Sequence, residues 1–261
     1  MIDLHAHILP ALDDGPPDLD ASAEMAAAAV AAGTRVMAAT SHVNRGFGLR
    51  AEQLAAARAL VVERLAADGI PLEVVQGGEV ALSRAGDLGD EELRGLTLGG
   101  SRWVLLECPL SPAAPSMEPA VTALRRRGFE VLLAHPERSP GFMRGPGPLE
   151  RLLALGAIAQ VTSGSFAGEF GDTVRRAAFS LLERGLVHVL ASDGHGARHR
   201  PPEPGRALAA FEQRYEREDA RAQFEWMASS APGALLAAEP LPERPEPPRA
   251  PRGLLRRFRA G

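Results

Sequence analysis

The chain has 261 residues, enough for one large α/β domain or two small ones, and its net charge of −4 and pI of about 6.0 indicate no basic surface for nucleic acid. All 29 basic residues are arginine, which excludes Schiff-base lysine chemistry and carboxylated-lysine metal bridges, and the single cysteine excludes an internal disulfide. No apolar run reaches the ~18 residues of a transmembrane segment and the N-terminus lacks the basic region of a secretory signal, so we expect a soluble cytoplasmic protein.

Short apolar runs that alternate with longer helical segments dominate the chain. The expected strands are residues 2–7, 35–40, 71–76, 103–106, 130–134, 157–161 and 186–191. The expected helices are residues 22–32, 51–67, 117–127, 149–155, 172–184, 205–217 and 219–229, with a short helix within the glycine-containing stretch 84–100. Such alternation indicates βα units and a parallel sheet. Seven units predict an α/β fold with a closed or nearly closed barrel.

The first strand carries Asp3, His5 and His7 on one face, because successive side chains of a strand point to opposite faces. Two imidazoles at this spacing can chelate one metal ion, with Asp3 as an orienting partner behind them. By itself the His-x-His pair could equally be two ordinary polar residues. The metal-site interpretation depends on further ligands elsewhere in the chain.

Further candidate ligands follow later strands or the first loop. They are Asp14, His42, Glu79, Glu107, His135, Asp193 and His195. In parallel barrels the chemistry lies at the C-terminal ends of the strands, where most of these residues fall. Nine donors exceed the three or four of a mononuclear site and suffice for two or three metal ions. Mixed nitrogen and oxygen donors suit Mn²⁺, Fe²⁺ or Zn²⁺.

Several of these residues also have simpler interpretations. Asp13-Asp14-Gly15 could be only a turn, and His42 could be a loop histidine. Glu107 at the end of an apolar strand would be a costly buried charge without a metal or a cation beside it. Three residues are left out of the site because we expect them to face outer helices, solvent and the core, respectively: His188, His199 and Cys108.

Two arginines lie close to candidate ligands in the sequence. Arg138 follows His135 by three residues, and Arg200 follows His195 by five. Each alone could be a surface charge, but beside a polymetal centre a pair of arginines can clamp phosphate oxygens.

The composition changes near residue 239. We expect one domain over residues 1–238 and a Pro/Arg-rich, disordered C-terminal tail over residues 239–261. An alternative for the basic stretch 252–259 is a short amphipathic anchor for a partner or an anionic membrane surface.

The ordered set of motifs resembles the polymerase-and-histidinol-phosphatase (PHP) superfamily, and within it most resembles the bacterial manganese-dependent tyrosine phosphatases of capsule and exopolysaccharide loci. The resemblance covers roughly residues 1–240. It rests on Met1–Pro10 with Asp13-Asp14-Gly15, Ala39–His42, Gly78–Val80, Leu106-Glu107, His135–Arg138, Gln160–Ser165, Ser192–His195 and Ala231–Leu236. The family often has Thr-Pro-His-His at 40–43 and alanine at 194; these departures remove no ligand.

This resemblance implies a single-domain, distorted (β/α)₇ TIM-like barrel of the PHP fold with three divalent ions, Mn²⁺ first and Fe²⁺ or Zn²⁺ as alternatives. It places the ions as follows: one on His5, His7, Glu79 and Asp193; one on Glu79, Glu107 and His135; and one on Asp14, His42 and His195. A metal-activated hydroxide would attack phosphorus in line, with Arg138 and Arg200 on the phosphate and Glu107 in the reacting site.

The implied substrate is a phosphotyrosine protein, with the C-terminal tail of a bacterial tyrosine kinase as one form, and the implied role is control of capsular polysaccharide synthesis. A histidinol-phosphatase-like phosphomonoesterase is an alternative. A metallo-amidohydrolase is another, although the missing lysine and the two arginines argue against it. A non-enzymatic scaffold that binds a kinase tail is the third.

Overall fold

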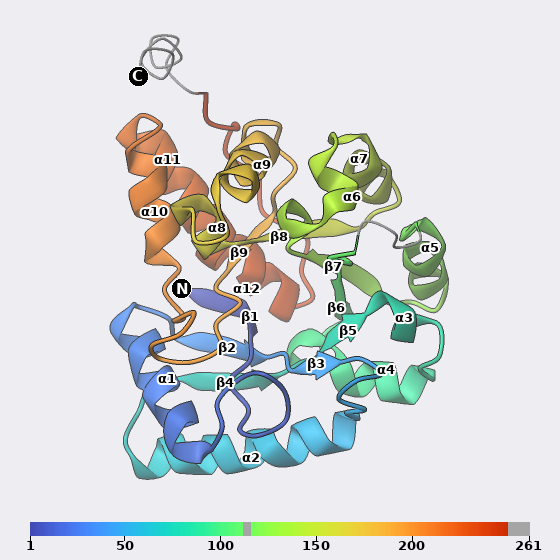
Figure 1. The fold of residues 1–261 in the computed structure, drawn as a ribbon, viewed down its shortest axis with the longest axis vertical. Helices are drawn as coiled ribbons and strands as arrows, with labels where there is room; N and C mark the ends of the chain where they lie inside the picture. The colour runs from blue at the N-terminus through green and yellow to red at the C-terminus, as the bar shows by residue number, and fades with distance from the viewer. Residues whose placement is uncertain (112–115, 250–261) are drawn as a thin grey trace.

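The computed structural model describes residues 1–111 and 116–249 (Figure 1). Its strands are short and pair in parallel throughout. They are β1 (Ile2–Ala6), β2 (Val36–Ala39), β3 (His42–Val43), β4 (Glu73–Gln76), β5 (Glu79–Ala81), β6 (Trp103–Glu107), β7 (Glu130–Ala134), β8 (Ile158–Thr162) and β9 (Val189–Ala191). One sheet has the order β1-β2-β4, and the other has the order β3-β5-β6-β7-β8-β9. The fold is therefore mixed α/β with parallel sheets, as the alternating pattern predicted.

Two of the expected strands continue past a break. Thr40 and Ser41 separate β2 from β3, and Gly77 and Gly78 separate β4 from β5. Because of these breaks, each of the two chain segments contributes one short strand to each sheet.

Hydrogen bonds also join the first strand to the last. The amide of Asp193 donates to the carbonyl of His5 at 2.8 Å, and the amide of His7 donates to the carbonyl of Gly194 at 2.8 Å. Residues at the two ends of the βα series are therefore neighbours.

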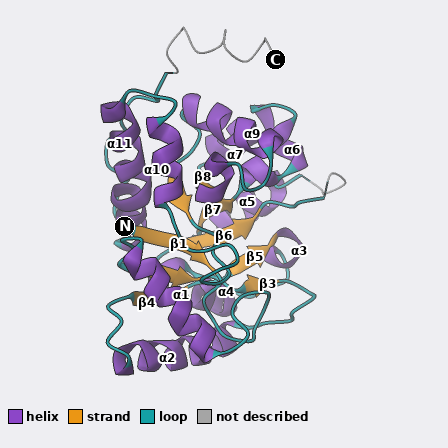
Figure 2. Ribbon diagram, turned by 60° about the vertical axis from the view of Figure 1, so that its left-hand side comes forward, coloured by secondary structure: helices purple, strands orange, loops and turns teal. Residues whose placement is uncertain are grey.

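Helices surround the strands on the outside (Figure 2). They are α1 (Leu19–Ala31), α2 (Ala51–Ala67), α3 (Leu82–Ala85), α4 (Asp90–Leu96), α5 (Glu118–Arg126), α6 (Pro140–Met143), α7 (Gly147–Ala154), α8 (Ser163–Ala167), α9 (Asp172–Glu183), α10 (Gly205–Glu212), α11 (Arg217–Glu225) and α12 (Ala231–Leu236). Short 3₁₀ turns η1 (Leu98–Gly100) and η2 (Pro136–Arg138) and the π-helical turn η3 (Trp226–Ser230) complete the set. We expected one short helix within residues 84–100, and the structure has the end of α3, all of α4 and the turn η1 there. The short helices α6 and α8 were not expected.

The apolar core lies on both faces of the sheets. In β6, Val104 and Leu106 belong to the large cluster under the helices, whereas Leu105 belongs to a smaller cluster with Leu132 and Val189. This alternation follows from the two-residue period of a strand. Both faces of the strands are thus covered, which explains why the strands read as continuous apolar runs.

Residues 239–249, which we expected to be disordered, lie along the surface of α11 and η3. The side-chain amide of Gln223 donates to the carbonyls of Pro245 and Glu246 at 2.9 and 2.7 Å, and Trp226 Nε1 donates to the carbonyl of Pro242 at 3.2 Å. A proline-rich segment can make such contacts because its extended backbone leaves carbonyls free to accept. Residues 250–261, including the proposed basic anchor, lie outside the described residues.

Within residues 1–111 and 116–249, no helix is both long and apolar enough to cross a bilayer.

Candidate metal centre

His5 of β1, His7 just after that strand, and two carboxylates from later in the chain surround one small space. The Nε2 atoms of His5 and His7 are 3.3 Å apart. Glu79 Oε2 lies 3.5 Å from both Nε2 atoms, and Asp193 Oδ1 lies 3.4 and 3.5 Å from them. A tetrahedron of donors about 2.1 Å from a metal ion has edges of about 3.4 Å. The distances between the two imidazole nitrogens, and from each of them to the two carboxylate oxygens, are therefore close to such an edge.

Glu79 lies between this group and two further imidazoles. Its Oε2 atom is 2.8 Å from His42 Nδ1, and its Oε1 atom is 2.9 Å from His135 Nε2. A donor atom of Glu107 lies within 4.8 Å of donor atoms of both His42 and Glu79. Glu107 thus groups with His42 and Glu79, and the charge of His135 also acts on it. A carboxylate with imidazoles near both oxygens can bridge two cations.

A third group lies toward the solvent. Asp14 Oδ1 is 3.3 Å from His195 Nε2 and 3.6 Å from His42 Nε2. The rings of His7 and His195 stack with centroids 4.0 Å apart. The Asp14 side chain is 54% exposed, whereas those of His5, His7 and Glu79 are fully buried. All nine predicted donors therefore lie in overlapping groups, with Asp14 at the solvent side.

Backbone conformation at the strand ends brings these residues inward. His135, Asp193 and Arg200 have φ values of 39°, 51° and 52°, in the left-handed region that non-glycine residues rarely adopt. Such conformations cost free energy and persist where the surrounding structure imposes them, most often at functional sites.

Two residues hold the β1 histidines from behind. Asp13 Oδ2 lies 2.8 Å from His7 Nδ1 and accepts from the amide of His42 at 2.9 Å. Gln160 Oε1 lies 3.0 Å from His5 Nδ1. Partners of this kind fix the ring orientation and leave Nε2 free to bind a metal.

The assignment of this orienting role to Asp3 is wrong. Asp3 Oδ1 accepts from the amides of His5 and Ser192 at 3.2 and 3.1 Å, so it holds backbone rather than an imidazole. In the sequence, Asp13 was visible only as part of a possible turn, and Gln160 only as part of a family motif.

Electrostatics within the site oppose the effect of burial. Burial alone would lower the pKa of His7, but Asp13, Asp193 and Glu79 raise that pKa well above its usual value. Burial alone would raise the pKa of Glu79, but His5, His135 and His42 hold it well below its usual value. The pKa of Glu107 is raised, first by burial and then by the charge of Glu79.

The buried donors fit divalent cations. Glu79 Oε2, His42 Nδ1 and His135 Nδ1 are buried and, apart from the 2.8 Å contact between the first two, have no hydrogen-bond partner. Buried groups without a hydrogen-bond partner are costly, whereas a metal ion satisfies them. An all-imidazole and carboxylate donor set without thiolate suits Mn²⁺, Fe²⁺ or Zn²⁺.

The two predicted arginines meet at one carboxylate oxygen. Arg138 NH1 and Arg200 NH2 both contact Asp193 Oδ2, and Arg200 NH1 lies 3.1 Å from His195 Nε2. The ring of Phe170 lies 4.3 Å from the guanidinium carbon of Arg138 and 5.8 Å from that of Arg200. Two planar cations beside the donor cluster can bind an oxyanion. Nothing in the sequence singled out Phe170.

Residues 1–230 match the family model for capsular polysaccharide synthesis proteins, CpsB/CapC. The chain belongs to this family. It is 36% identical over 222 residues to the tyrosine-protein phosphatase YwqE of Bacillus subtilis, covering 84% of this chain and 86% of that one. It is 28% identical over 232 residues to the tyrosine-protein phosphatase CpsB of Streptococcus pneumoniae, covering 86% and 95%.

Solved structures agree with this membership in the CpsB/CapC family. A structure from a study of B. subtilis YwqE and S. pneumoniae CpsB, described as metal-dependent tyrosine phosphatases, matches with a TM-score of 0.81 and 32% identity, covering 97% of this chain and all of that one. The phosphotriesterase of Mycobacterium tuberculosis matches with a TM-score of 0.55 and 15% identity, covering 90% and 93%, which shows likeness of fold alone.

The residues left out of the site lie where expected in this CpsB/CapC chain. His188 is largely buried against Trp226 of η3, with ring centroids 6.4 Å apart, and burial lowers its pKa to about 4. His199 is exposed, and Cys108 is fully buried.

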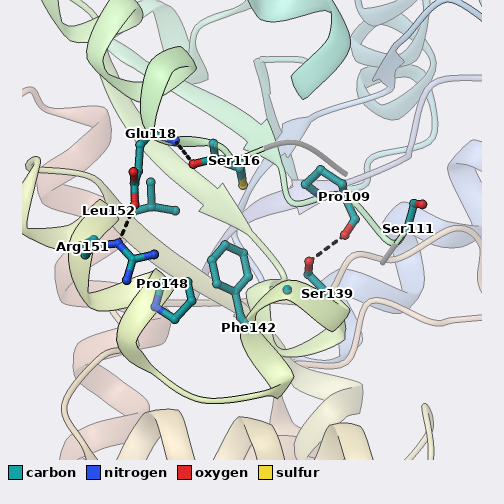
Figure 3. Close-up of a pocket in the computed structure, with 11 residues that line it drawn as sticks. Pro109, Ser111, Ser116, Glu118, Ser139, Phe142, Pro148, Arg151 and Leu152 are labelled. Carbon is teal, nitrogen blue, oxygen red and sulfur yellow. Dashed lines mark hydrogen bonds and ion pairs between the residues drawn. The ribbon is translucent and has the colours of Figure 1, made fainter. Parts of the chain in front are cut away.

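A cavity of about 230 Å³ is lined by residues that follow β6 and β7 in the chain, and none of the nine donors lines it (Figure 3). Pro109 and Ser139 line it, and Ser139 Oγ donates to the carbonyl of Pro109 at 2.6 Å. Arg151 Nε donates to Glu118 at 2.6 Å across its other side. The cavity thus borders the loop that carries Arg138 without offering metal donors.

Proposed function

We propose that this chain is a metal-dependent protein-tyrosine phosphatase that hydrolyses phosphotyrosine and regulates capsular or extracellular polysaccharide synthesis. The observation that carries the proposal is the convergence of nine imidazole and carboxylate side chains beside two arginines. Membership in the CpsB/CapC family and the names of its relatives support the same activity.

We propose that the two sheets form one distorted (β/α)₇ TIM-like barrel of the PHP type, with residues 1–238 as the catalytic domain. The hydrogen bonds between β1 and the end of β9 support a ring of strands. Residues 239–249 would then be an extension that covers η3 from outside.

The donor set supports three divalent ions, and we propose Mn²⁺. His5, His7, Glu79 and Asp193 would hold one, and Glu79 would be shared with a second. His135 and Glu107 would complete that second set. Asp14, His42 and His195 would hold the third. When bound, such ions neutralise phosphate charge and lower the pKa of attached water from 15.7 towards about 7.

The side chains of the site would then position the substrate. Arg138 and Arg200, which in this structure share Asp193 Oδ2, are the groups we propose to hold the phosphate oxygens. A tyrosine leaving group has a pKa of about 10, so it needs less proton assistance than an alkyl alcohol. Cys108 is buried with a raised pKa, so no thiol nucleophile takes part.

We further propose that the substrate is a cytoplasmic phosphotyrosine protein, with the C-terminal tail of a bacterial tyrosine kinase as the specific form. The capsular polysaccharide role of the family supports this choice. A phosphotyrosyl tail is a flexible ligand that can reach a site recessed among strand ends.

The deciding experiment is metal analysis of the purified protein, followed by phosphatase assays after chelation and after addition of Mn²⁺. We expect chelation to abolish turnover of a phosphotyrosyl peptide and Mn²⁺ to restore it. Glu79→Ala should lose at least about 10²-fold in kcat, because Glu79 lies between several donors. Glu73→Ala, an exposed carboxylate in β4, is the matched control and should keep full activity. Full metal-dependent turnover by Glu79→Ala would contradict the assignment.

The same assay separates the remaining alternatives. Faster turnover of histidinol phosphate than of the peptide at equal enzyme would indicate a small-molecule phosphomonoesterase. Turnover of amides or lactones in place of phosphate esters would indicate an amidohydrolase, a class to which the chain has a likeness of fold alone.

A further inference from the structure

Phe47 lies in the loop between β3 and α2, and its side chain is exposed. Among the described residues, the exposed large hydrophobic side chains are those of Phe47, Leu60, Val62, Leu110 and Leu155. Phe47 is the aromatic member of this set and is 44% exposed. The exposed part of the Phe47 ring is apolar area that a bound aryl group could cover, with a gain in free energy in proportion to that area.

Hydrogen bonds, rather than burial, hold this loop. Asn44 Oδ1 accepts from the amides of Gly46 and Phe47 at 2.8 and 2.9 Å, and the carbonyl of Asn44 accepts from the amide of Gly48 at 3.1 Å. The backbone of Phe47 is therefore fixed on both sides although its ring is in contact with solvent. A loop backbone fixed in this way does not have to be ordered again when the Phe47 ring contacts a ligand.

The ring of Phe47 lies beside the candidate metal centre. It is parallel to the ring of His42, with an angle of 2° between planes and 5.9 Å between centroids. His42 in turn lies 2.8 Å from Glu79 and 3.6 Å from Asp14. Phe47 thus contacts the candidate metal centre through the ring of His42.

The site opens to solvent on this same side. The side chains of Asp14 and His42 are 54% and 18% exposed, whereas His5, His7 and Glu79 are fully buried. A phosphate at the buried donors can therefore leave the rest of its ester on the side of Asp14 and His42. The ring of Phe47 lies on that side, stacked on the ring of His42.

We propose that Phe47 binds the phenyl ring of the substrate and makes the site selective for aryl over alkyl phosphate esters. This inference rests on the proposed phosphatase function and names its specificity residue. Aromatic pairs prefer offset-stacked or edge-to-face contact, and one such pair changes affinity by about two- to tenfold. Phosphotyrosine presents a phenyl ring directly after its phosphate, whereas phosphoserine and histidinol phosphate do not.

A different role for Phe47 is to pack against His42 and orient it. The two roles differ in what the substitution changes. If Phe47 only orients His42, its substitution should change the metal content and should weaken the binding of every phosphate compound by the same factor. A residue that contacts the substrate ring affects aryl compounds alone.

The test is calorimetric binding of phenylphosphonate and methylphosphonate to the Mn²⁺-loaded protein. We expect the wild type to bind phenylphosphonate more tightly. Phe47→Ala should weaken the affinity for phenylphosphonate about two- to tenfold and leave the affinity for methylphosphonate and the metal content unchanged. Phe47→Tyr should keep the preference for phenylphosphonate. Leu60→Ala, which removes an exposed apolar side chain from α2, is the control and should change neither affinity.

Kinetics supply the second measurement. Phe47→Ala should raise KM for a phosphotyrosyl peptide and leave kcat nearly unchanged, with no effect on the phosphoseryl peptide of the same sequence. Equal losses for both phosphonates, or no change in either, would overturn the proposal. A wild type that binds phenylphosphonate preferentially but does not hydrolyse the phosphotyrosyl peptide would instead overturn the proposed function.

Discussion

Asp13 determines which nitrogen of His7 faces the metal centre. Its carboxylate lies 2.8 Å from His7 Nδ1, and its pKa is held below the usual range, since His7 and the amides of His42 and Gly15 outweigh the effect of burial. With Nδ1 engaged, Nε2 is the nitrogen that points at His5 and Glu79.

Substituting Asp13 should therefore weaken metal binding without removing a ligand. We expect Asp13→Ala to lower Mn²⁺ affinity about 10- to 100-fold, the usual cost of losing such an orienting partner. Asp13→Asn, which keeps one acceptor oxygen, should lose less. Calorimetric titration of the metal-free protein measures both, with Asp18→Ala, which removes the side-chain cap of α1, as a control for general loss of stability. Equal affinity for all three variants would show that His7 does not need Asp13.

How far the site could be predicted depends on what each residue does. Alternation over residues 2–7 and the rule that candidate donors follow strands were sufficient to select His5, His7 and Glu79, which the structure brings together. Asp13 and Gln160 are contacts behind those ligands, and their partners are fixed only by tertiary geometry. The same holds for Phe170, which contacts two arginines that are distant in sequence.

At the scale of elements, strand breaks give the site its shape. A Cβ on Gly78 would lie 2.8 Å from Leu96 Cδ2, and one on Gly77 would lie 3.0 Å from Thr40 Cγ2. Because Gly77 and Gly78 have no side chain, the backbone can pass close to Thr40 and Leu96 at this break, and β5 begins at the next residue, Glu79. The expected strand 71–76 ended at the right residue, but periodicity alone could not show that the chain resumes as a strand in the second sheet.

Glu137 connects two of these elements. Its Oε1 atom accepts from the amide of Thr162 at 3.0 Å and from Ser165 Oγ at 2.7 Å, which ties η2 to the end of β8 and to α8. Burial raises the pKa of Glu137, and its second oxygen makes no hydrogen bond.

Removing this connection should destabilise the loop that carries Arg138. We expect Glu137→Ala to lower the free energy of unfolding by about 1–3 kcal/mol, because two buried donors lose their acceptor. Glu137→Gln keeps the accepting oxygen and should cost less than about 1 kcal/mol. Urea denaturation distinguishes the two. A glutamine variant as unstable as the alanine variant would mean that the negative charge, and not the acceptor, is needed.

For the whole molecule, the candidate metal centre connects the beginning of the chain to its end. The donors come from β1 and the loop after it, from β3, β5 and β6, and from the loops that follow β7 and β9. The sequence predicted this order of βα units well, because each unit is local. It did not predict the packing of residues 239–249. These residues contact Gln223 and Trp226 through backbone carbonyls, which every residue has, so no side-chain pattern marks them.

Metal binding should consequently stabilise the entire fold. A cation that binds the folded state alone contributes about 2.7 kcal/mol at a hundredfold excess over Kd. We expect Mn²⁺ to raise the Tm of the chelated protein by several degrees, in a concentration-dependent way, and the rise to be much smaller for Glu79→Gln. Differential scanning calorimetry with and without Mn²⁺ measures this, with Glu73→Gln as the control. Identical Tm values for the chelated and loaded wild type would contradict it.

Each of the two carboxylate oxygens of Asp193 has a different set of neighbours, and both sets need a negatively charged acceptor. One oxygen belongs to the cluster of imidazole nitrogens, and the other receives both guanidinium groups. An asparagine at position 193 would have one acceptor oxygen and one NH₂ donor. In either rotamer the NH₂ group would face the two guanidinium groups or the cluster of imidazole nitrogens, and neither offers it a suitable acceptor. No neutral isostere can serve both neighbours at once. A substitution at Asp193 should therefore disturb the arginine pair and the candidate metal centre together.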